Sequence, residues 1–129
     1  MEEKGIKALI VDDEADFREL MAFWLKSRGY EVLTAAEGET AVKITQQERP
    51  DIIFMDLSMP VLDGYGALKQ IREFNKEVPV IIISAYVDDK KAKEAMTLGI
   101  SGVFYKGKDF QEGLSLLEAA LRTHKQLKK

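Results

Sequence analysis

Short, continuous runs of apolar residues recur along the chain, separated by stretches with helical periodicity. The runs are rich in β-branched residues and do not alternate with polar ones, which is typical of strands covered on both faces of a sheet. We expect five such strands, at residues 8–11, 32–35, 52–55, 80–83 and 103–105. A helical pattern follows each strand. This order predicts an α/β domain in which a parallel sheet lies between two layers of helices.

The helical patterns differ in clarity, and the first is the clearest. Its apolar residues recur at intervals of three and four, which predicts one apolar stripe along a helix that ends near Gly29. The stripe consists of Phe17, Leu20, Met21, Trp24 and Leu25. The later helices are marked by Ala41 and Ile44, by Leu68 and Ile71, by Ala92, Ala95 and Met96, and by Phe110, Leu114, Leu117 and Leu121.

Composition narrows the class of protein. The 129 residues are enough for one domain, which we place at 1–129 with frayed termini at 1–5 and 125–129. Cysteine is absent, which excludes disulfides and thiolate metal sites and favours a reducing, cytoplasmic location. No secretory signal or membrane-spanning stretch is recognisable. A net charge of −3 argues against direct nucleic-acid contact, because an acidic domain gains no attraction to a phosphate backbone.

Polar side chains follow four of the five predicted strands. Asp12 and Asp13 follow the first strand, Asp56 the third, Ser84 the fourth and Lys106 the fifth. The carboxyl ends of parallel strands meet at one edge of the sheet, where open α/β sheets bind ligands. We therefore expect these side chains to converge.

Each of these residues also has a simpler structural explanation. Asp13 and Asp16 have the spacing of a helix-capping pair, and Ser84 or Lys106 taken singly would be a turn residue and a solvated lysine. Asp56 is harder to explain in this way, because it ends an apolar strand with no helix start beside it. The convergence of carboxylates, a hydroxyl and an ammonium on one edge favours a functional site.

Neighbouring carboxylates repel one another, and burial raises their pKa values. A divalent cation removes this penalty, and oxygen ligands with room for water suit Mg²⁺. The only histidine, His124, is expected on the surface of the last helix, away from these acids. We therefore expect Mg²⁺ at this edge, where an approaching phosphate would otherwise be repelled.

The same residues carry a family likeness. Over essentially its whole length the chain resembles the receiver domain of two-component response regulators. The matching segments are LIVDD at 9–13, DIIFMD at 51–56, MPVLDG at 59–64, VIIISA at 80–85 and LGISG at 98–102, followed by Lys106. The resemblance implies strand order 2-1-3-4-5 in a flavodoxin-like or CheY-like three-layer sandwich with five helices, which would bring the acids after the first and third strands into one pocket.

The resemblance also implies a role for each acid. Asp56 matches the phosphoacceptor, whose carboxylate attacks the phosphohistidine of a partner and becomes an aspartyl phosphate. Asp13, Asp56 and the backbone carbonyl of Ser58 match the ligands of Mg²⁺, with Asp12 as outer support. The expected function is a phosphorylation-dependent signalling switch, which acts on its own phosphorylation state and is otherwise not an enzyme.

Two further residues complete the implied site. Lys106 matches the ammonium that pairs with a phosphoryl oxygen, and Ser84 matches the hydroxyl that moves to bond another. The implied partners are a sensor histidine kinase or a phosphotransfer protein, and a downstream protein target or fused output domain. A phosphorylation-dependent dimer is a further possibility. The alternative function is a receiver-like interaction module that acts without phosphorylation.

The chain departs from the family pattern around the fifth strand. Gly107 stands where many receivers have proline, and Val103 stands where they have the switch aromatic. Tyr105 lies on the same side of the strand about 7 Å further along, at ~3.3 Å per residue, so either it substitutes partially or the coupling runs without a rotating ring. Lys108 is a rival for the lysine role, but Lys106 directly closes the strand and is favoured.

Other interpretations concern enzymes and surfaces. A phosphotransferase of the dehalogenase type expects an Asp-x-Asp motif at the first strand, and a flavodoxin-like cofactor binder expects a glycine-rich loop there; the segment 12–14 is Asp-Asp-Glu and fits neither. The fourth helix is either a solvated face or a partner surface. Its charged residues are Asp88, Asp89, Lys90, Lys91, Lys93 and Glu94.

Overall fold

The computed structural model describes residues 5–85 and 90–128. Its middle layer is one sheet of five strands, namely β1 (Lys7–Val11), β2 (Glu31–Ala35), β3 (Ile52–Asp56), β4 (Val80–Ser84) and β5 (Gly102–Tyr105). All neighbouring strands are parallel, in the order β2-β1-β3-β4-β5. The predicted parallel sheet and its implied strand order are both confirmed.

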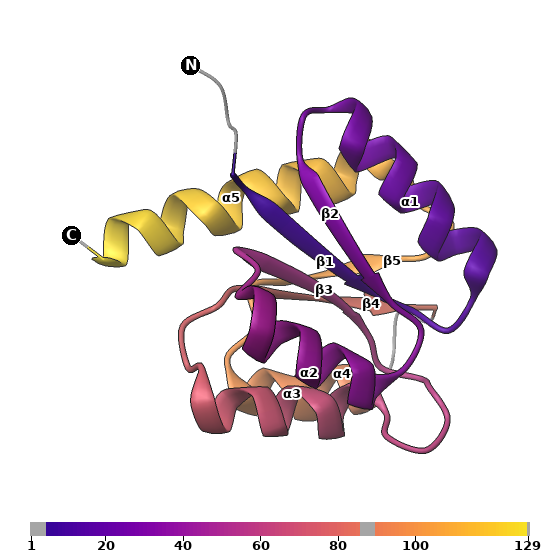
Figure 1. Cartoon of the computed structure of the whole chain (residues 1–129), viewed down its shortest axis with the longest axis vertical. Helices are drawn as coiled ribbons and strands as arrows, with labels where there is room; N and C mark the ends of the chain where they lie inside the picture. The colour runs from indigo at the N-terminus through magenta and orange to yellow at the C-terminus, as the bar shows by residue number, and fades with distance from the viewer. Residues whose placement is uncertain (1–4, 86–89, 129) are drawn as a thin grey trace.

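Helices cover the two faces of the sheet. They are α1 (Ala15–Ser27), α2 (Gly38–Glu48), α3 (Gly64–Phe74), α4 (Lys90–Ala95) and α5 (Phe110–Lys128), with a short 3₁₀ helix, η1 (Met96–Leu98), after α4. Figure 1 shows α1 and α5 on one face and α2, α3 and α4 on the other. The three-layer sandwich is therefore confirmed. No helix in the described part of the chain is long and apolar enough to cross a membrane.

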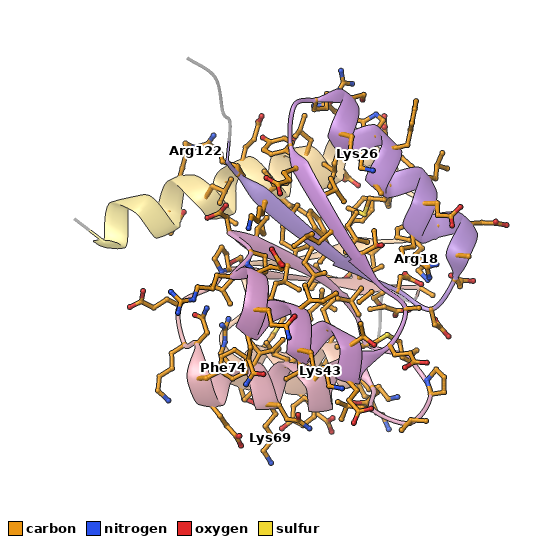
Figure 2. All side chains as sticks on the ribbon, in the orientation of Figure 1. Arg18, Lys26, Lys43, Lys69, Phe74 and Arg122 are labelled. Atoms are coloured by element: carbon orange, nitrogen blue, oxygen red, sulfur yellow. The ribbon has the colours of Figure 1, made fainter. Side chains whose placement is uncertain are left out.

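The sheet divides the core into two apolar clusters. Alternate side chains of one strand enter opposite clusters, so that Leu9 packs toward α2, α3 and α4 while Ile10 packs toward α1 and α5. Every residue of β3 and β4 is buried, which explains why these strands are continuously apolar up to their last, polar residue. Figure 2 shows charged side chains such as Lys69 on the outer surface of the helical layers.

The apolar stripe predicted for α1 is only partly correct. Met21, Ala22 and Leu25 are buried, but Leu20 is 58% exposed. The periodicity predicted Leu20 because it lies three residues after Phe17, yet the buried face of the helix includes Ala22 instead. Gly29 follows the helix with φ +97°, a left-handed conformation that ends it as predicted.

The fourth helix is shorter than its pattern of apolar residues predicts. Ala92 and Ala95 are buried as predicted, but Met96 is 59% exposed, because α4 stops at Ala95 and the chain tightens into η1. Asp88 and Asp89 lie outside the described residues, as do the terminal residues 1–4 and 129. The side chain of His124 is likewise outside the described part.

Candidate functional site

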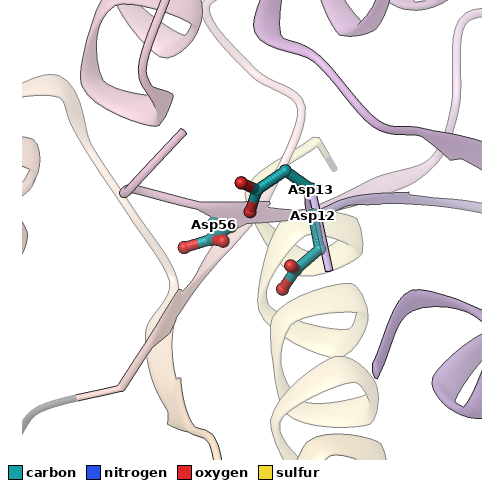
Figure 3. A group of neighbouring side chains, drawn as sticks. All are labelled: Asp12, Asp13 and Asp56. Atoms are coloured by element: carbon teal, nitrogen blue, oxygen red, sulfur yellow. The ribbon is translucent and has the colours of Figure 1, made fainter. Parts of the chain in front are cut away.

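The acids after β1 and β3 meet because these two strands are neighbours. Asp12 follows β1 directly and Asp56 is the last residue of β3. One carboxylate oxygen from each of Asp12, Asp13 and Asp56 lies within 4.8 Å of the other two. Figure 3 shows the three carboxyl groups gathered where the strands end. Asp12 and Asp56 are buried and Asp13 is exposed, so the cluster opens to solvent on the Asp13 side.

A cleft of about 330 Å³ opens above the cluster. Its lining residues are Asp13, Glu14, Asp56, Ser58, Ser84, Ala85 and Lys106. Every candidate site residue predicted from the sequence except Asp12 is among them, and Asp12 lies beside them with its side chain fully buried. The rival Lys108 is exposed and does not line the cleft. Glu14 is the lining residue that the sequence reasoning missed.

Lys106 is the cation of the cleft. Its Nζ lies 3.0 Å from Asp12 Oδ2 and 3.7 Å from Asp56 Oδ2, and it also donates a hydrogen bond to Glu14. Asp12 Oδ2 has no well-aligned hydrogen bond, so its interaction with Lys106 is an ion pair. Burial alone would lower the pKa of Lys106, but hydrogen bonds to Glu14 and Asp12 and the charges of the nearby acids raise it. The ammonium is therefore charged at neutral pH.

The backbone fixes where Lys106 and Ser84 stand. Lys106 N donates to the carbonyl oxygen of Ser84 at 2.8 Å, which continues the pairing of β4 with β5 by one residue. Ser84 is buried at the end of β4, one residue after Ile83, which pairs with Asp56 on β3. The lysine and the hydroxyl therefore enter the cleft from adjacent strand ends.

Asp56 is an acid whose ionisation is suppressed. Burial raises its pKa to about 7, and the charge of Asp12 adds to this effect. The Ser58 N–H, which donates to Asp56 Oδ1 at 3.1 Å, and the charge of Lys106 both act to lower the pKa. A divalent cation beside the carboxylate would favour its ionised form.

The simpler explanation for Asp13, that it caps α1, is contradicted by the structure. Glu14 is the N-cap residue, and its side chain makes no capping hydrogen bond. The local hydrogen bond belongs to Asp12, whose Oδ1 accepts from Glu14 N at 2.8 Å. Within the described residues, the Asp13 carboxylate has neither a hydrogen bond nor an ion pair. An exposed, unpaired carboxylate beside two buried ones fits a divalent cation bound through oxygen atoms.

The loop after β3 is held tightly against the acid. A Cβ on Gly64 would overlap the carbonyl oxygen of Asp56, so only glycine permits this close approach. Asp63 caps α3 by accepting from Gly66 N at 2.9 Å. Two residues before Asp63, in the same loop, the fully exposed Val61 has φ +67°, a conformation that β-branched residues rarely adopt.

The unusual residues of β5 have defined places. Val103 pairs with Ile82 and packs against the apolar cluster on the α2–α4 side, while Tyr105 pairs with Ser84. Gly107 has φ +92°, a left-handed conformation that favours glycine, and no peptide bond of the described residues is cis. A partial switch role for Tyr105 stays a prediction.

Comparison with known proteins agrees with this geometry. The family model described as the response regulator receiver domain matches residues 8–118. The chain is 38% identical over 116 residues to the probable transcriptional regulator ycf27 of Guillardia theta, covering 90% of this chain and 45% of that protein. It is 34% identical to the regulatory protein AtoC of Escherichia coli, covering 90% of this chain and 25% of that protein. The chain thus spans about half or less of these relatives.

Solved structures show the same fold. The chemotaxis protein CheY4 of Vibrio cholerae is 32% identical and superposes with a TM-score of 0.84, covering 89% of this chain and 98% of that one. A response regulator receiver domain protein from Clostridium thermocellum is 28% identical with a TM-score of 0.87, covering 94% of this chain and 98% of that one. The chain therefore belongs to the response regulator receiver domain family, whose members are signalling modules rather than classical enzymes.

Proposed function

We propose that this chain is a phosphorylation-dependent switch whose phosphoacceptor is Asp56. The observation that carries the proposal is the cleft itself, in which a buried acid stands between two further acids and an ammonium. Membership of the receiver family supports the proposal. The acidic pocket and Lys106 also support it, because an aspartyl-phosphate switch requires these groups. We also infer that residues 1–129 form a single receiver domain, which the family match over 8–118 supports.

In the proposed reaction, an Asp56 carboxylate oxygen bonds to phosphorus while the bond from phosphorus to the donor nitrogen breaks, leaving an acyl phosphate. Lys106 Nζ, 3.7 Å from Asp56 Oδ2, is close enough to pair with an oxygen of the transferred group. The Ser84 hydroxyl would bond a second oxygen. Asp56 must be ionised to attack, so its raised pKa has to be offset before transfer.

We infer that the site uses Mg²⁺. Asp13, Asp56 and the backbone carbonyl of Ser58 would hold the ion, with Asp12 as outer support. When bound, it supplies positive charge that offsets the carboxylates and the phosphoryl oxygens. The unpaired Asp13 carboxylate and the oxygen-only donor set support this assignment.

The donor that fits this chemistry is a sensor histidine kinase or a phosphotransfer protein. Leu20 and Phe23 are 58% and 71% exposed on α1, the helix that starts next to the acidic cluster. They are three residues apart, so they share one helix face. We infer that this apolar pair contributes to donor docking.

The output is inferred from the relatives. The chain spans less than half of two proteins named as transcriptional or regulatory proteins, so a fused output domain or a separate protein target would receive the signal. A phosphorylation-dependent dimer, a cytoplasmic location and the absence of direct nucleic-acid contact by this domain also stay proposals. The acidic net charge of −3 supports the last of these.

The proposal is tested by exposing the protein to Mg²⁺ and a small acyl phosphate and measuring its intact mass. We expect one phosphoryl group on the wild type, released by hydroxylamine, and none on Asp56→Asn. Asp16→Asn, which removes an exposed acid from α1, is the matched control and should behave as wild type. Equal labelling of Asp56→Asn would reject Asp56 as acceptor.

A second candidate function is an interaction module that works without phosphorylation. Val103 in place of the switch aromatic favours it, because the usual rotating ring is missing from that position of β5. The same mass measurement separates the two functions, since a pure interaction module would take up no phosphoryl group with Mg²⁺ present.

A further inference from the structure

Two residues at the start of α1, Glu14 and Phe17, contact the ammonium group of Lys106. Glu14 Oε1 accepts a hydrogen bond from Lys106 Nζ, and the centroid of the Phe17 ring lies 5.0 Å from the same nitrogen. A cation at this distance from an aromatic face is attracted to it. Neither Glu14 nor Phe17 has a part in the proposed transfer to Asp56, so these contacts require another explanation.

Lys106 Nζ is shared unequally among three carboxylates. Glu14 is its closest partner, Asp12 Oδ2 follows at 3.0 Å, and Asp56 Oδ2 is the most distant at 3.7 Å. Since the attraction between charges falls with distance, the ammonium is drawn toward the α1 side of the cleft. Asp56, on which a phosphoryl group would form, is therefore the most weakly contacted of the three acidic partners of Lys106.

The Phe17 side of this arrangement is packed against other aromatic rings. The Phe17 ring centroid is 6.4 Å from that of Phe104 and 5.8 Å from that of Phe110, so Phe17 is one member of a packed aromatic cluster between α1, β5 and α5. Glu14 by contrast is 63% exposed on its side chain. Lys106 thus contacts both a packed aromatic ring and a largely exposed acid.

We propose that Glu14 and Phe17 are positioning residues that hold Lys106 on the α1 side of the cleft until a phosphoryl group draws it across. The proposal rests on the proposed function of Asp56. A phosphoryl group carries ~1.5 to 2 negative charges near neutral pH, more than the single charge of Glu14. Lys106 then exchanges Glu14 for a phosphoryl oxygen, and Glu14 sets how readily that exchange occurs.

The first test needs neither metal nor phosphate. The ¹H–¹⁵N signal of the Lys106 ammonium is followed by NMR in the metal-free, unphosphorylated protein. We expect Glu14→Gln to speed hydrogen exchange of this ammonium several-fold, as expected when a charge-assisted hydrogen bond is lost. We expect Phe17→Leu to remove the ring-current shift of its protons. Asp16→Asn removes the same charge two residues away and should leave the signal unchanged.

Loss of folding in Glu14→Gln is not expected to affect this test, because the Glu14 side chain makes no capping hydrogen bond to α1. An unchanged Lys106 signal in Glu14→Gln, or an equal change in Asp16→Asn, would overturn the proposal.

The second test measures the rate constant of phosphorylation by a small acyl phosphate at saturating Mg²⁺. We expect Glu14→Gln to be faster by about threefold, because pairwise couplings of this kind change rates by factors of two or more. Asp16→Asn should match the wild type, and Glu14→Asp should restore most of the wild-type rate. An equal gain in Asp16→Asn would mean that general charge at the cleft mouth is responsible, and the positioning role would be rejected. If the wild type takes up no phosphoryl group, the proposed function fails, and the NMR result alone decides the positioning role.

Discussion

Asp56 is buried at the end of an apolar strand, and this burial has a measurable consequence for stability. In the folded chain its pKa is raised to about 7, whereas an unfolded chain ionises aspartate near 3.8. The folded state therefore holds the proton more tightly. The stabilisation that this provides is fully present below about pH 4 and is lost as the pH rises to about 7.

We predict that Asp56→Asn is increasingly more stable than the metal-free wild type as the pH rises from about 4 to 7. The asparagine has no charge to bury, and one pKa unit corresponds to about 1.4 kcal/mol, so the gap should reach at least about 1 kcal/mol. Urea unfolding at a series of pH values measures it. A gap that stays constant with pH would show that Asp56 ionises normally in the folded protein.

Val61 carries backbone strain in the loop beside the acceptor. Its φ of +67° costs a β-branched residue roughly 1–2 kcal/mol, and its fully exposed side chain gains no burial in return. Val61→Asn, which tolerates this conformation, should raise the free energy of unfolding by about 1 kcal/mol. Chemical denaturation measures the change. A loss of stability in this variant would contradict the assigned strain.

At the scale of elements, we expect alanine substitutions at two glycines to have opposite effects on stability. A Cβ on Gly113 in α5 would lie 3.6 Å from Phe104 and 3.7 Å from Met21, in ordinary contact. Gly113→Ala should therefore stabilise the protein by about 0.5–1 kcal/mol, the usual gain within a helix. Gly64→Ala should destabilise it, because the new methyl overlaps the Asp56 carbonyl. Thermal unfolding compares the two, and equal signs would contradict the packing described here.

Much of the architecture was predictable from the sequence, because continuous apolar strands and their polar last residues leave a clear pattern. The position of Leu20 was not, since periodicity does not reveal where a helix rotates against a sheet. Local spacing alone could not exclude capping by Asp13, because capping pairs and strand-end acids share one residue type. The Glu14–Lys106 contact joins residues 92 positions apart. No local pattern predicts such a contact, because it depends on how the start of α1 packs near the end of β5.

At the scale of the whole molecule, cation binding and folding are linked. A cation that binds only the folded chain stabilises it by mass action. We predict that millimolar Mg²⁺ raises the unfolding midpoint of the wild type and leaves that of Asp13→Asn unchanged. The Asp13 side chain is exposed and unpaired within the described residues, so this substitution should not disturb the fold. An equal rise in both proteins would place the cation elsewhere.

We propose that the whole domain acts through one covalent event, the phosphorylation of an aspartate. The central claim is that this aspartate is Asp56. The most direct measurement is to phosphorylate the wild type with Mg²⁺ and a small acyl phosphate, reduce it with borohydride and map the products by peptide mass spectrometry. Reduction converts an aspartyl phosphate to homoserine. We predict homoserine at position 56 and at no other aspartate. Homoserine at position 12 or 13, or none at all, would contradict the account.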